Sequence, residues 1–231
     1  MYNYIKHIVF DLDGVLMDSR DLHYYALNDA LRTISDSYVI TRDEHLSSYD
    51  GKSTKTKLSL LTEHKQLPES EYDKVWQLKQ TFTRQRLQSI EENLELQRLF
   101  KSLKDNNLKI SIASNAIRET VLTSLERVGV LKYCDYVLTN EDVFLPKPNA
   151  EMYMRCMIHT KTNPDETVIV EDSHTGRKGA IRSGSHLCPV TGPEDVTFNY
   201  ITNFIKTKEI MAQSIEEEID DLSKQDIEGL D

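Results

Sequence analysis

Several features are scarce or missing in this sequence of 231 residues, and each absence argues against a class of protein. The three cysteines, Cys134, Cys156 and Cys188, are scattered and include no Cys-X-X-Cys pair. They therefore indicate reduced core residues, and neither a disulfide framework nor a zinc site. No apolar run approaches the length of a membrane span, and the first residues show no signal-peptide pattern. We expect a soluble, cytoplasmic protein with no membrane partner.

Positive charge is also in deficit. Lys and Arg number 28 against 38 Asp and Glu, which gives a formal net charge of −10. Such a negative overall field argues against binding to nucleic acid. Hydrophobic residues make up 39% of the chain, which is enough for a sizeable core. The composition is that of a globular protein with no nucleic-acid partner expected.

The apolar pattern changes along the chain. Residues 5–10 form a compact apolar run, which is typical of a buried strand. Residues 19–89 then have a helical pattern without a strong strand, and from residue 94 helices and strands alternate. Further strands are expected at 108–113, 136–138, 167–170 and 187–190. This alternation predicts an α/β fold, a Rossmann-like parallel sheet with helices on both faces, plus an all-helical insert after the first strand.

The final residues, 207–231, are dominated by Glu and Asp. This composition favours a solvated or disordered acidic tail. An amphipathic helix or a segment that binds a protein partner is the alternative, because Ile210, Ile215, Ile219 and Leu222 have suggestive spacing. We therefore divide the chain into a core domain (1–18 and 90–206), a helical insert (19–89) and a tail (207–231).

One short stretch, Gly51-Lys52-Ser53-Thr54, resembles the end of a P-loop. The first glycine of that motif would fall at position 46, which is Leu46, and no buried strand precedes the stretch. We therefore reject a P-loop.

Polar residues follow three of the expected strands. Asp11-Leu12-Asp13-Gly14 follows the first, Ser114-Asn115 the second and Glu171-Asp172-Ser173 a third, while Lys147 lies in a loop between the last two of these strands. Singly, each has an ordinary explanation as a turn residue, a helix cap or a solvated side chain. Parallel strands bind ligands at their carboxyl ends, however, so together these residues place carboxylates, a hydroxyl and an ammonium at one edge.

Clustered carboxylates repel one another unless a cation lies among them, and Mg²⁺ suits carboxylates together with a phosphate oxygen. The chemistry that fits is covalent phosphoryl transfer, in which a carboxylate attacks phosphorus and forms an aspartyl-phosphate. A cation, a lysine and hydrogen-bond donors would hold the phosphate oxygens. A second carboxyl group would protonate the leaving oxygen and then activate water.

These residues also carry a family resemblance. The segment from Asp11 to Asp18, read as Asp-Leu-Asp-Gly-Val-Leu-Met-Asp, resembles the first motif of the haloacid dehalogenase-like (HAD) superfamily. Ser114, Lys147-Pro148 and Glu171-Asp172 resemble the second, third and fourth motifs, in that order. Residues 147–153 and 170–173 are especially similar to the branch that contains beta-phosphoglucomutase and phosphoglycolate phosphatase. The insert resembles the helical cap of that branch.

The resemblance implies a role for each acidic residue. Asp11 would be the nucleophile and a metal ligand. Asp13 would be the general acid and base, and its backbone carbonyl would bind the metal. Asp172 would bind Mg²⁺ through its carboxylate, and Glu171 would do so directly or through water.

The resemblance also assigns the other site residues. Ser114, Lys147 and the neighbouring Asn115 would bind the transferring phosphate. His23 corresponds to a histidine of the sugar-phosphate mutases that helps to position Asp13, although a polar residue on a helix face is an equal alternative.

Substrate choice in this branch belongs to the cap. The mutases carry a Gly-X-Ser-Arg stretch that grips a second phosphate, and here Thr54 stands in place of the arginine. Lys52 or Lys55 could replace it only as a point charge. We therefore favour a phosphatase acting on a small phosphorylated metabolite, of the sugar phosphate or phosphoglycolate type, over a phosphomutase.

Two further hypotheses are weaker. A haloacid dehalogenase needs no metal, whereas Asp13 and the Glu171-Asp172 pair are all present. The other is a binding or regulatory module that has no catalytic activity and binds a partner through the acidic tail. Such a module would not explain why the motifs are intact.

Overall fold

The structure is a computed structural model that describes residues 2–49 and 52–228. Its centre is a sheet of five strands in the order β3-β2-β1-β4-β5. Every neighbouring pair of strands is parallel, which confirms the predicted parallel sheet. The strands lie close to the expected positions: β1 (His7–Phe10), β2 (Lys109–Ala113), β3 (Tyr136–Leu138), β4 (Thr167–Glu171) and β5 (His186–Pro189).

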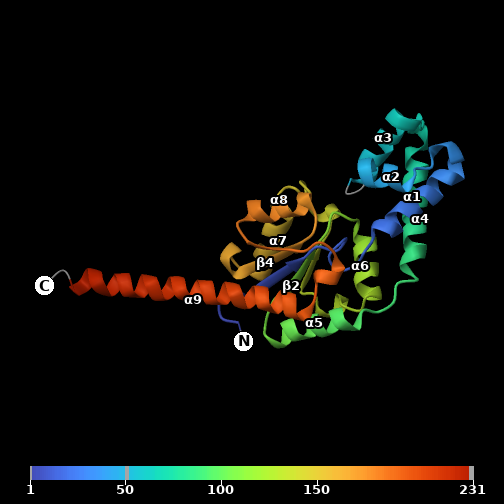
Figure 1. Ribbon diagram of the computed structural model, residues 1–231. Coiled ribbons are helices and arrows are strands. Elements are labelled where there is room, and N and C mark those ends of the chain that lie inside the picture. The colour runs from blue at the N-terminus through green and yellow to red at the C-terminus, as the bar shows by residue number, and fades with distance from the viewer. Residues whose placement is uncertain (1, 50–51, 229–231) are drawn as a thin grey trace.

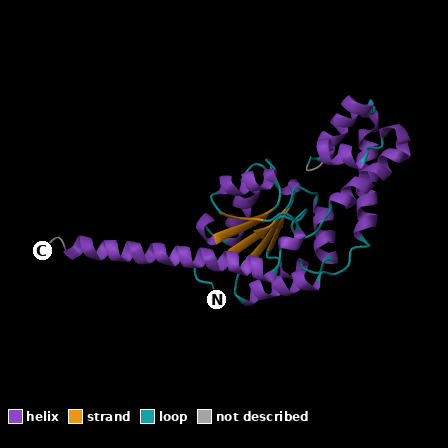
Figure 2. Cartoon of the chain, in the orientation of Figure 1, coloured by secondary structure: helices purple, strands orange, loops and turns teal. Residues whose placement is uncertain are grey.

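Helices cover both faces of the sheet (Figures 1 and 2). Side chains of β1 alternate between the faces, so that Ile8 and Phe10 enter one hydrophobic cluster and Val9 enters another. The first face is covered by α5 (Leu94–Asp105), α6 (Arg118–Arg127) and the beginning of α9 (Phe198–Glu228). The second face is covered by α7 (Glu151–Thr160) and α8 (His174–Ser183). This arrangement confirms the predicted Rossmann-like α/β fold.

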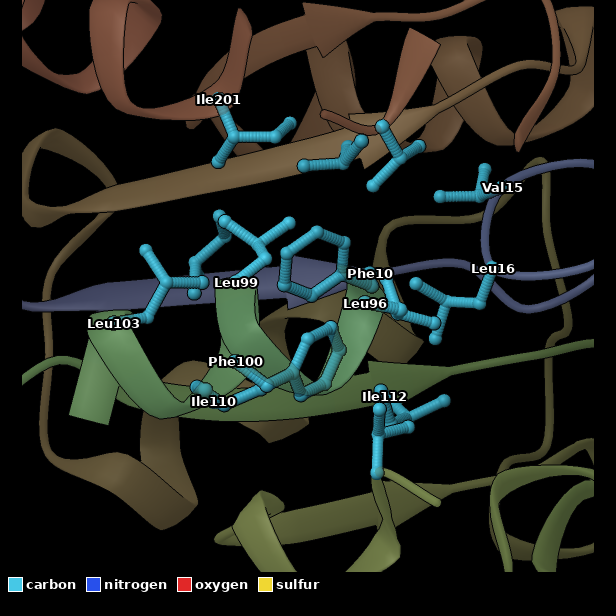
Figure 3. Close-up of a cluster of buried hydrophobic side chains, with 14 of the residues drawn as sticks. Phe10, Val15, Leu16, Leu96, Leu99, Phe100, Leu103, Ile110, Ile112 and Ile201 are labelled. Atoms are coloured by element: carbon cyan, nitrogen blue, oxygen red, sulfur yellow. The ribbon is translucent and has the colours of Figure 1, made fainter. Parts of the chain in front are cut away.

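The largest cluster holds the end of β1 in place. The rings of Phe10 and Phe100 stack with centroids 4.9 Å apart. Figure 3 shows Leu96, Leu99 and Leu103 of α5 on the same side, facing the sheet. Phe10 is the residue before the predicted nucleophile, so this packing fixes the point where the chain leaves the sheet.

The segment between β1 and α5 is helical and has its own core. It contains α1 (Arg20–Ile34), α2 (Arg42–Glu44), a π-helical turn (His45–Tyr49), α3 (Thr54–Lys65) and α4 (Tyr72–Leu87). Figure 1 shows these helices to one side of the sheet. Their buried apolar residues form a separate cluster: Leu27, Ala30, Leu31, Ile40, Tyr49, Leu58, Leu61, Leu67 and Val75. The predicted helical insert is therefore present, while its division from the core at 18/19 and 89/90 stays a prediction.

The acidic tail is helical as far as it is described. Helix α9 runs from Phe198 to Glu228, so a disordered tail is wrong for residues 207–228, while the exposed residues 213–218 agree with a solvated one. Residues 229–231 lie outside the described part. The helix packs against the sheet through Ile201 and Ile205, and extending an existing helix costs less free energy than nucleating a new one. Farther along, Ile210 and Ile215 are exposed, and the helix extends away from the sheet (Figure 1). A protein partner for this segment stays a prediction.

The cysteines are free thiols, as the sequence predicts. Cys156 and Cys188 are buried, and burial raises the pKa of each to about 12. They are therefore protonated core residues at neutral pH. Within the described residues, no helix has both the length and the apolar character needed to cross a membrane.

Glu209 on α9 fastens the segment that leads into β1. Its carboxylate accepts hydrogen bonds from the backbone N–H groups of Asn3, Tyr4 and Ile5, at 2.7, 2.9 and 2.6 Å. In Glu209→Ala these donors lose their partner, so we expect the free energy of unfolding to fall by about 1–3 kcal/mol in urea denaturation. Glu218→Ala removes an exposed charge from the same helix and should change it by less than about 0.5 kcal/mol. Equal losses in the two variants would contradict this anchoring role.

Candidate active site

The carboxyl ends of three adjacent strands bring the predicted site residues together. Asp11 follows β1, Ser114 follows β2 and Glu171 is the last residue of β4. Parallel pairing puts these ends level, since Phe10 pairs with both Ile112 and Val170. Asp11, Ser114 and Glu171 are all buried.

Lys147 joins two of the carboxylates. It lies in the loop between β3 and α7, and its Nζ atom donates to Asp11 Oδ1 at 2.8 Å and to Glu171 Oε1 at 2.5 Å. Burial alone would lower the pKa of Lys147, but the charges of Asp11 and Glu171 outweigh it and raise that pKa well above its usual value. The result is a fixed, permanently charged ammonium beside the predicted nucleophile.

The carboxyl groups of Asp11 and Asp172 are both in unfavourable electrostatic positions. Burial, followed by the charge of Glu171, raises the pKa of Asp11 well above its usual value, although Lys147 opposes the shift. The same two causes raise the pKa of Asp172 to about 6. In addition, Asp172 Oδ1 is buried and has no hydrogen-bond partner among the described residues. A positive charge placed beside these groups would stabilise their ionised forms.

These carboxylates fit a divalent cation. Asp11, Glu171 and Asp172 each offer an oxygen, and the three oxygens lie within 4.8 Å of one another. All-oxygen donor sets suit hard cations. Lys147 donates to Asp11 and Glu171, whereas Asp172 Oδ1 receives no hydrogen bond from the described residues. The side chain of Asp13 is not a member of this group, and the predicted contribution of its backbone carbonyl stays a prediction.

Two glycines allow the carboxylates to approach the backbone. Gly14 has φ +82°, and a Cβ atom there would lie 2.1 Å from Asp172 Oδ2. A Cβ atom on Gly176 would lie 1.9 Å from Glu171 Oε1. Gly176 was not singled out from the sequence, although it is the third residue of a helix whose cap, Ser173, accepts its N–H.

Asp13 faces the cap helices. His23 on α1 places Nε2 3.4 Å from Asp13 Oδ1. Burial opposes ionisation of Asp13, but the hydrogen bond and charge of His23 outweigh it and lower the pKa of Asp13 to about 2. Burial and the charge of Lys79 lower the pKa of His23 itself. The structure thus brings His23 to Asp13, and Asp13 is ionised in the protein alone.

Asn115 and Ser114 organise the loops of the site. Asn115 Oδ1 accepts the N–H of Lys147 at 3.1 Å, and its Nδ2 donates to the Lys147 carbonyl at 3.3 Å. Ser114 Oγ accepts the N–H of Ala116 at 3.1 Å. Asn115 therefore positions Lys147, which precedes a cis peptide bond to Pro148. Direct contacts of Ser114 and Asn115 with phosphate stay a prediction.

Three further side chains at the site were not predicted. The Tyr153 hydroxyl on α7 donates to Glu171 Oε1 at 2.6 Å. Lys57 on α3 is buried, and Lys79 on α4 is partly buried. The sequence could have indicated that both lysines are partly buried, because Lys57 precedes Leu61 by four residues and Lys79 follows Val75 by four. Each lysine therefore stands within the apolar stripe of its helix.

The fold and the site define a class: an α/β enzyme with a carboxylate and lysine cluster at the carboxyl edge of a parallel sheet, and a helical cap. The sequence profile described as Haloacid dehalogenase-like hydrolase matches residues 8–190. The chain belongs to this family, as the motifs predicted.

Individual relatives agree with this assignment. A phosphorylated carbohydrates phosphatase of Thermotoga maritima is 26% identical over 182 residues, which cover 78% of this chain and 82% of the relative. The beta-phosphoglucomutase of Clostridium difficile has a TM-score of 0.73 at 19% identity, covering 89% of this chain and 99% of that one. A variant of CbbY from Rhodobacter sphaeroides, in complex with xylulose-(1,5)bisphosphate, has a TM-score of 0.73 at 18% identity, covering 81% and 87%. The two solved structures establish likeness of fold.

Proposed function

We propose that this protein is a Mg²⁺-dependent phosphatase that hydrolyses a small phosphorylated metabolite, of the sugar phosphate or phosphoglycolate type, through an aspartyl-phosphate. The observation that carries the proposal is the buried bridge of Lys147 between Asp11 and Glu171, next to the unpartnered oxygen of Asp172. This arrangement supports the proposal, because a nucleophile, a counter-charge for phosphate and a cation site would then lie in one cluster. The phosphatase name of the Thermotoga maritima relative supports the same chemistry.

Asp11 and Asp13 have different roles in the proposed reaction. A carboxylate oxygen of Asp11 forms a bond to phosphorus while the bond from phosphorus to the leaving oxygen breaks. Asp13 donates a proton to that oxygen, then takes a proton from the water that attacks phosphorus and restores Asp11. Lys147, with Ser114 and Asn115, holds the phosphate oxygens. Mg²⁺ bound by Asp11, Asp172, the Asp13 carbonyl and Glu171, the last directly or through water, would add positive charge there.

The low pKa of Asp13 must change for it to act as an acid. In the protein alone, the hydrogen bond from His23 keeps Asp13 ionised. A phosphate bound next to Asp13 adds negative charge, which favours the protonated carboxyl group and raises its pKa. Substrate binding would therefore favour protonation of Asp13, which could then donate this proton to the leaving oxygen.

A phosphomutase is the alternative, and the contact between His23 and Asp13 favours it because the resemblance assigns such a histidine to sugar-phosphate mutases. Against it, Thr54 stands where those mutases carry arginine; Gly51 of that stretch lies outside the described residues. A requirement for a bisphosphate activator, with an isomer as product, would identify a mutase.

Phosphate release from a panel of phosphorylated metabolites tests the function. With Mg²⁺ we expect release from at least one sugar phosphate or from phosphoglycolate. EDTA should abolish the release and added Mg²⁺ should restore it, because Asp11 and Asp172 need a cation to act together. No release from any compound would overturn the phosphatase proposal. Full activity after chelation would contradict its metal dependence.

A further inference from the structure

We propose that Tyr153 is a positioning residue for the cation site, and that its hydroxyl acts by holding the carboxylate of Glu171 in one orientation. This inference rests on the proposed Mg²⁺-dependent phosphatase function. It adds a residue to which the sequence assigned no role, and which contacts a ligand of the cation and not the cation itself.

Tyr153 reaches Glu171 from the helical layer on the second face of the sheet. It lies on α7 between Met152 and Cys156, which pack in the cluster on that face, and its own side chain is fully buried. Gly179 on α8 leaves room for the ring, because a Cβ atom at that position would lie 3.0 Å from Tyr153 Cε2. The packing of α7 and α8 therefore gives the phenol group a fixed place.

The Tyr153 hydroxyl shares one oxygen of Glu171 with Lys147. It donates to Glu171 Oε1 at 2.6 Å, and Lys147 Nζ donates to the same atom at 2.5 Å. The other oxygen, Oε2, accepts a hydrogen bond from the Ser173 hydroxyl at 3.2 Å. A carboxylate that accepts hydrogen bonds in several directions cannot turn without breaking one of them. These contacts therefore fix the rotation of the Glu171 carboxylate.

The ring of Tyr153 contacts the other partner of the buried ion pair. Lys147 Nζ lies 5.2 Å from the ring centroid, within the range of a cation–π interaction. Tyr153 thus touches Glu171 through its hydroxyl and Lys147 through its ring. A phenylalanine would keep the second contact and lose the first, so the hydroxyl can be tested separately.

The orientation of Glu171 is important because this carboxylate has two tasks. It pairs with Lys147, and it offers an oxygen to the cation site together with Asp11 and Asp172. Held by Lys147 alone, the carboxylate could turn further toward the ammonium. Side chains that hydrogen-bond to a metal ligand orient that ligand, and their loss typically costs about 10–100-fold in metal affinity or activity. Tyr153 is placed to have this effect through Glu171.

Tyr153→Phe tests the inference, because it removes the hydroxyl and keeps the ring. We expect the Kd for Mg²⁺, measured by isothermal titration calorimetry without substrate, to rise about tenfold or more. kcat/KM should fall at Mg²⁺ concentrations below the native Kd and recover at saturating Mg²⁺, since excess cation compensates for weaker binding. A tyrosine that served packing alone would leave the Kd unchanged, and that result would overturn the inference.

The matched control is Tyr4→Phe. The Tyr4 hydroxyl also donates to a carboxylate, Glu216 Oε2, at 2.7 Å, but Tyr4 precedes β1 whereas Asp11 follows it. The variant therefore loses the same kind of hydrogen bond at the opposite edge of the sheet. Its Kd for Mg²⁺ should stay within about twofold of the native value, as expected for an exposed substitution. An equal rise of the Kd in both variants would contradict a specific role for Tyr153.

A double-mutant cycle shows whether Tyr153 acts through Glu171. Glu171→Gln keeps the shape of the side chain and removes its charge, and it should raise the Kd for Mg²⁺ by itself. Adding Tyr153→Phe should raise the Kd by less than about a further twofold, because the carboxylate that the hydroxyl orients is already absent. A full tenfold effect of Tyr153→Phe in both backgrounds would contradict action through Glu171.

The binding and activity measurements together separate the modes of failure. Mg²⁺-dependent hydrolysis by the native protein, with an unchanged Kd in Tyr153→Phe, overturns this inference alone. No hydrolysis of any phosphorylated compound overturns the proposed function, while the Kd values still test Tyr153. No binding of Mg²⁺ by the native protein overturns both.

A second measurement keeps the inference testable where Tyr153→Phe fails to fold. Replacing Tyr153 by 3-fluorotyrosine keeps the hydroxyl and adds a reporter for fluorine NMR. Its resonance should shift as Mg²⁺ is added, with the same midpoint as the Mg²⁺ dependence of hydrolysis, because the cation and the hydroxyl share Glu171. The same label at Tyr4 should show no shift. Absence of a shift at position 153 would overturn the inference.

Discussion

Asp11→Asn is expected to lower phosphate release by about 10³-fold or more, because an amide cannot form the covalent bond to phosphorus and removal of a nucleophile has losses of this order. The substitution keeps the shape of the side chain. It also removes a carboxyl group whose ionisation burial disfavours, and Lys147 keeps its partner Glu171. The free energy of unfolding should therefore change little, so a loss of activity would report chemistry and not misfolding.

The matched control is Asp105→Asn. Asp105 is an acidic residue at the end of α5 that pairs on the surface with Lys101 and belongs to none of the site motifs. Its replacement should leave the rate of phosphate release within about twofold, as expected for an exposed pair. If Asp11→Asn retained more than about a tenth of the native rate, Asp11 could not be the nucleophile.

Lys147→Met should damage both activity and stability. It leaves the carboxylates of Asp11 and Glu171 buried together with no ammonium between them. Removing one partner of a buried ion pair typically costs about 3–5 kcal/mol, which we expect to see in the free energy of unfolding measured without Mg²⁺. We expect kcat/KM to fall by about 10²–10³-fold, since a fixed donor to the phosphate oxygens is lost.

The stability loss in Lys147→Met should depend on pH in a defined direction. The pKa of Asp11 is already raised in the folded protein, and loss of Lys147 removes the main group that opposes this shift. A folded state that holds a proton more tightly than the unfolded state loses stability as pH rises from the unfolded pKa of about 3.9 through the folded pKa. The variant should therefore be less destabilised at low pH than at neutral pH. Lys101→Met, at the exposed pair, should show no such dependence, and a pH-independent loss in Lys147→Met would contradict the buried bridge.

The sheet and the main cluster were predictable because they follow from rules of local pattern and topology. The apolar run before Asp11 predicts a buried strand, and parallel strands collect the residues that follow them at one edge. The observed order puts β1 between β2 and β4, which is what brings Asp11, Ser114 and Glu171 together. The residues that follow each strand were therefore sufficient to predict which side chains meet in the candidate site, while their roles in the reaction stay a prediction.

Other features depend on tertiary context that a sequence pattern does not carry. The acidic composition of residues 207–228 predicted disorder, but a helix already started on the sheet continues through them. Lys57 and Lys79 stand at apolar-stripe positions of two helices, and only the packing of the cap brings the charges of both close to His23. Glu171 and Asp172 look equivalent in the sequence. In the structure Tyr153 and Lys147 donate hydrogen bonds to Glu171, while Asp172 Oδ1 has no partner in the part of the chain that the structure describes.

The central claim is that Asp11 becomes phosphorylated during turnover, and a trapped intermediate tests it most directly. In Asp13→Asn, p-nitrophenyl phosphate can still transfer its phosphoryl group, because nitrophenolate leaves without a proton, whereas water activation needs Asp13. Acid quenching followed by peptide mass analysis should find one phosphoryl group on Asp11. A phosphoryl group on any other residue, or release of phosphate at the rate of nitrophenol with no labelled protein, would contradict the mechanism.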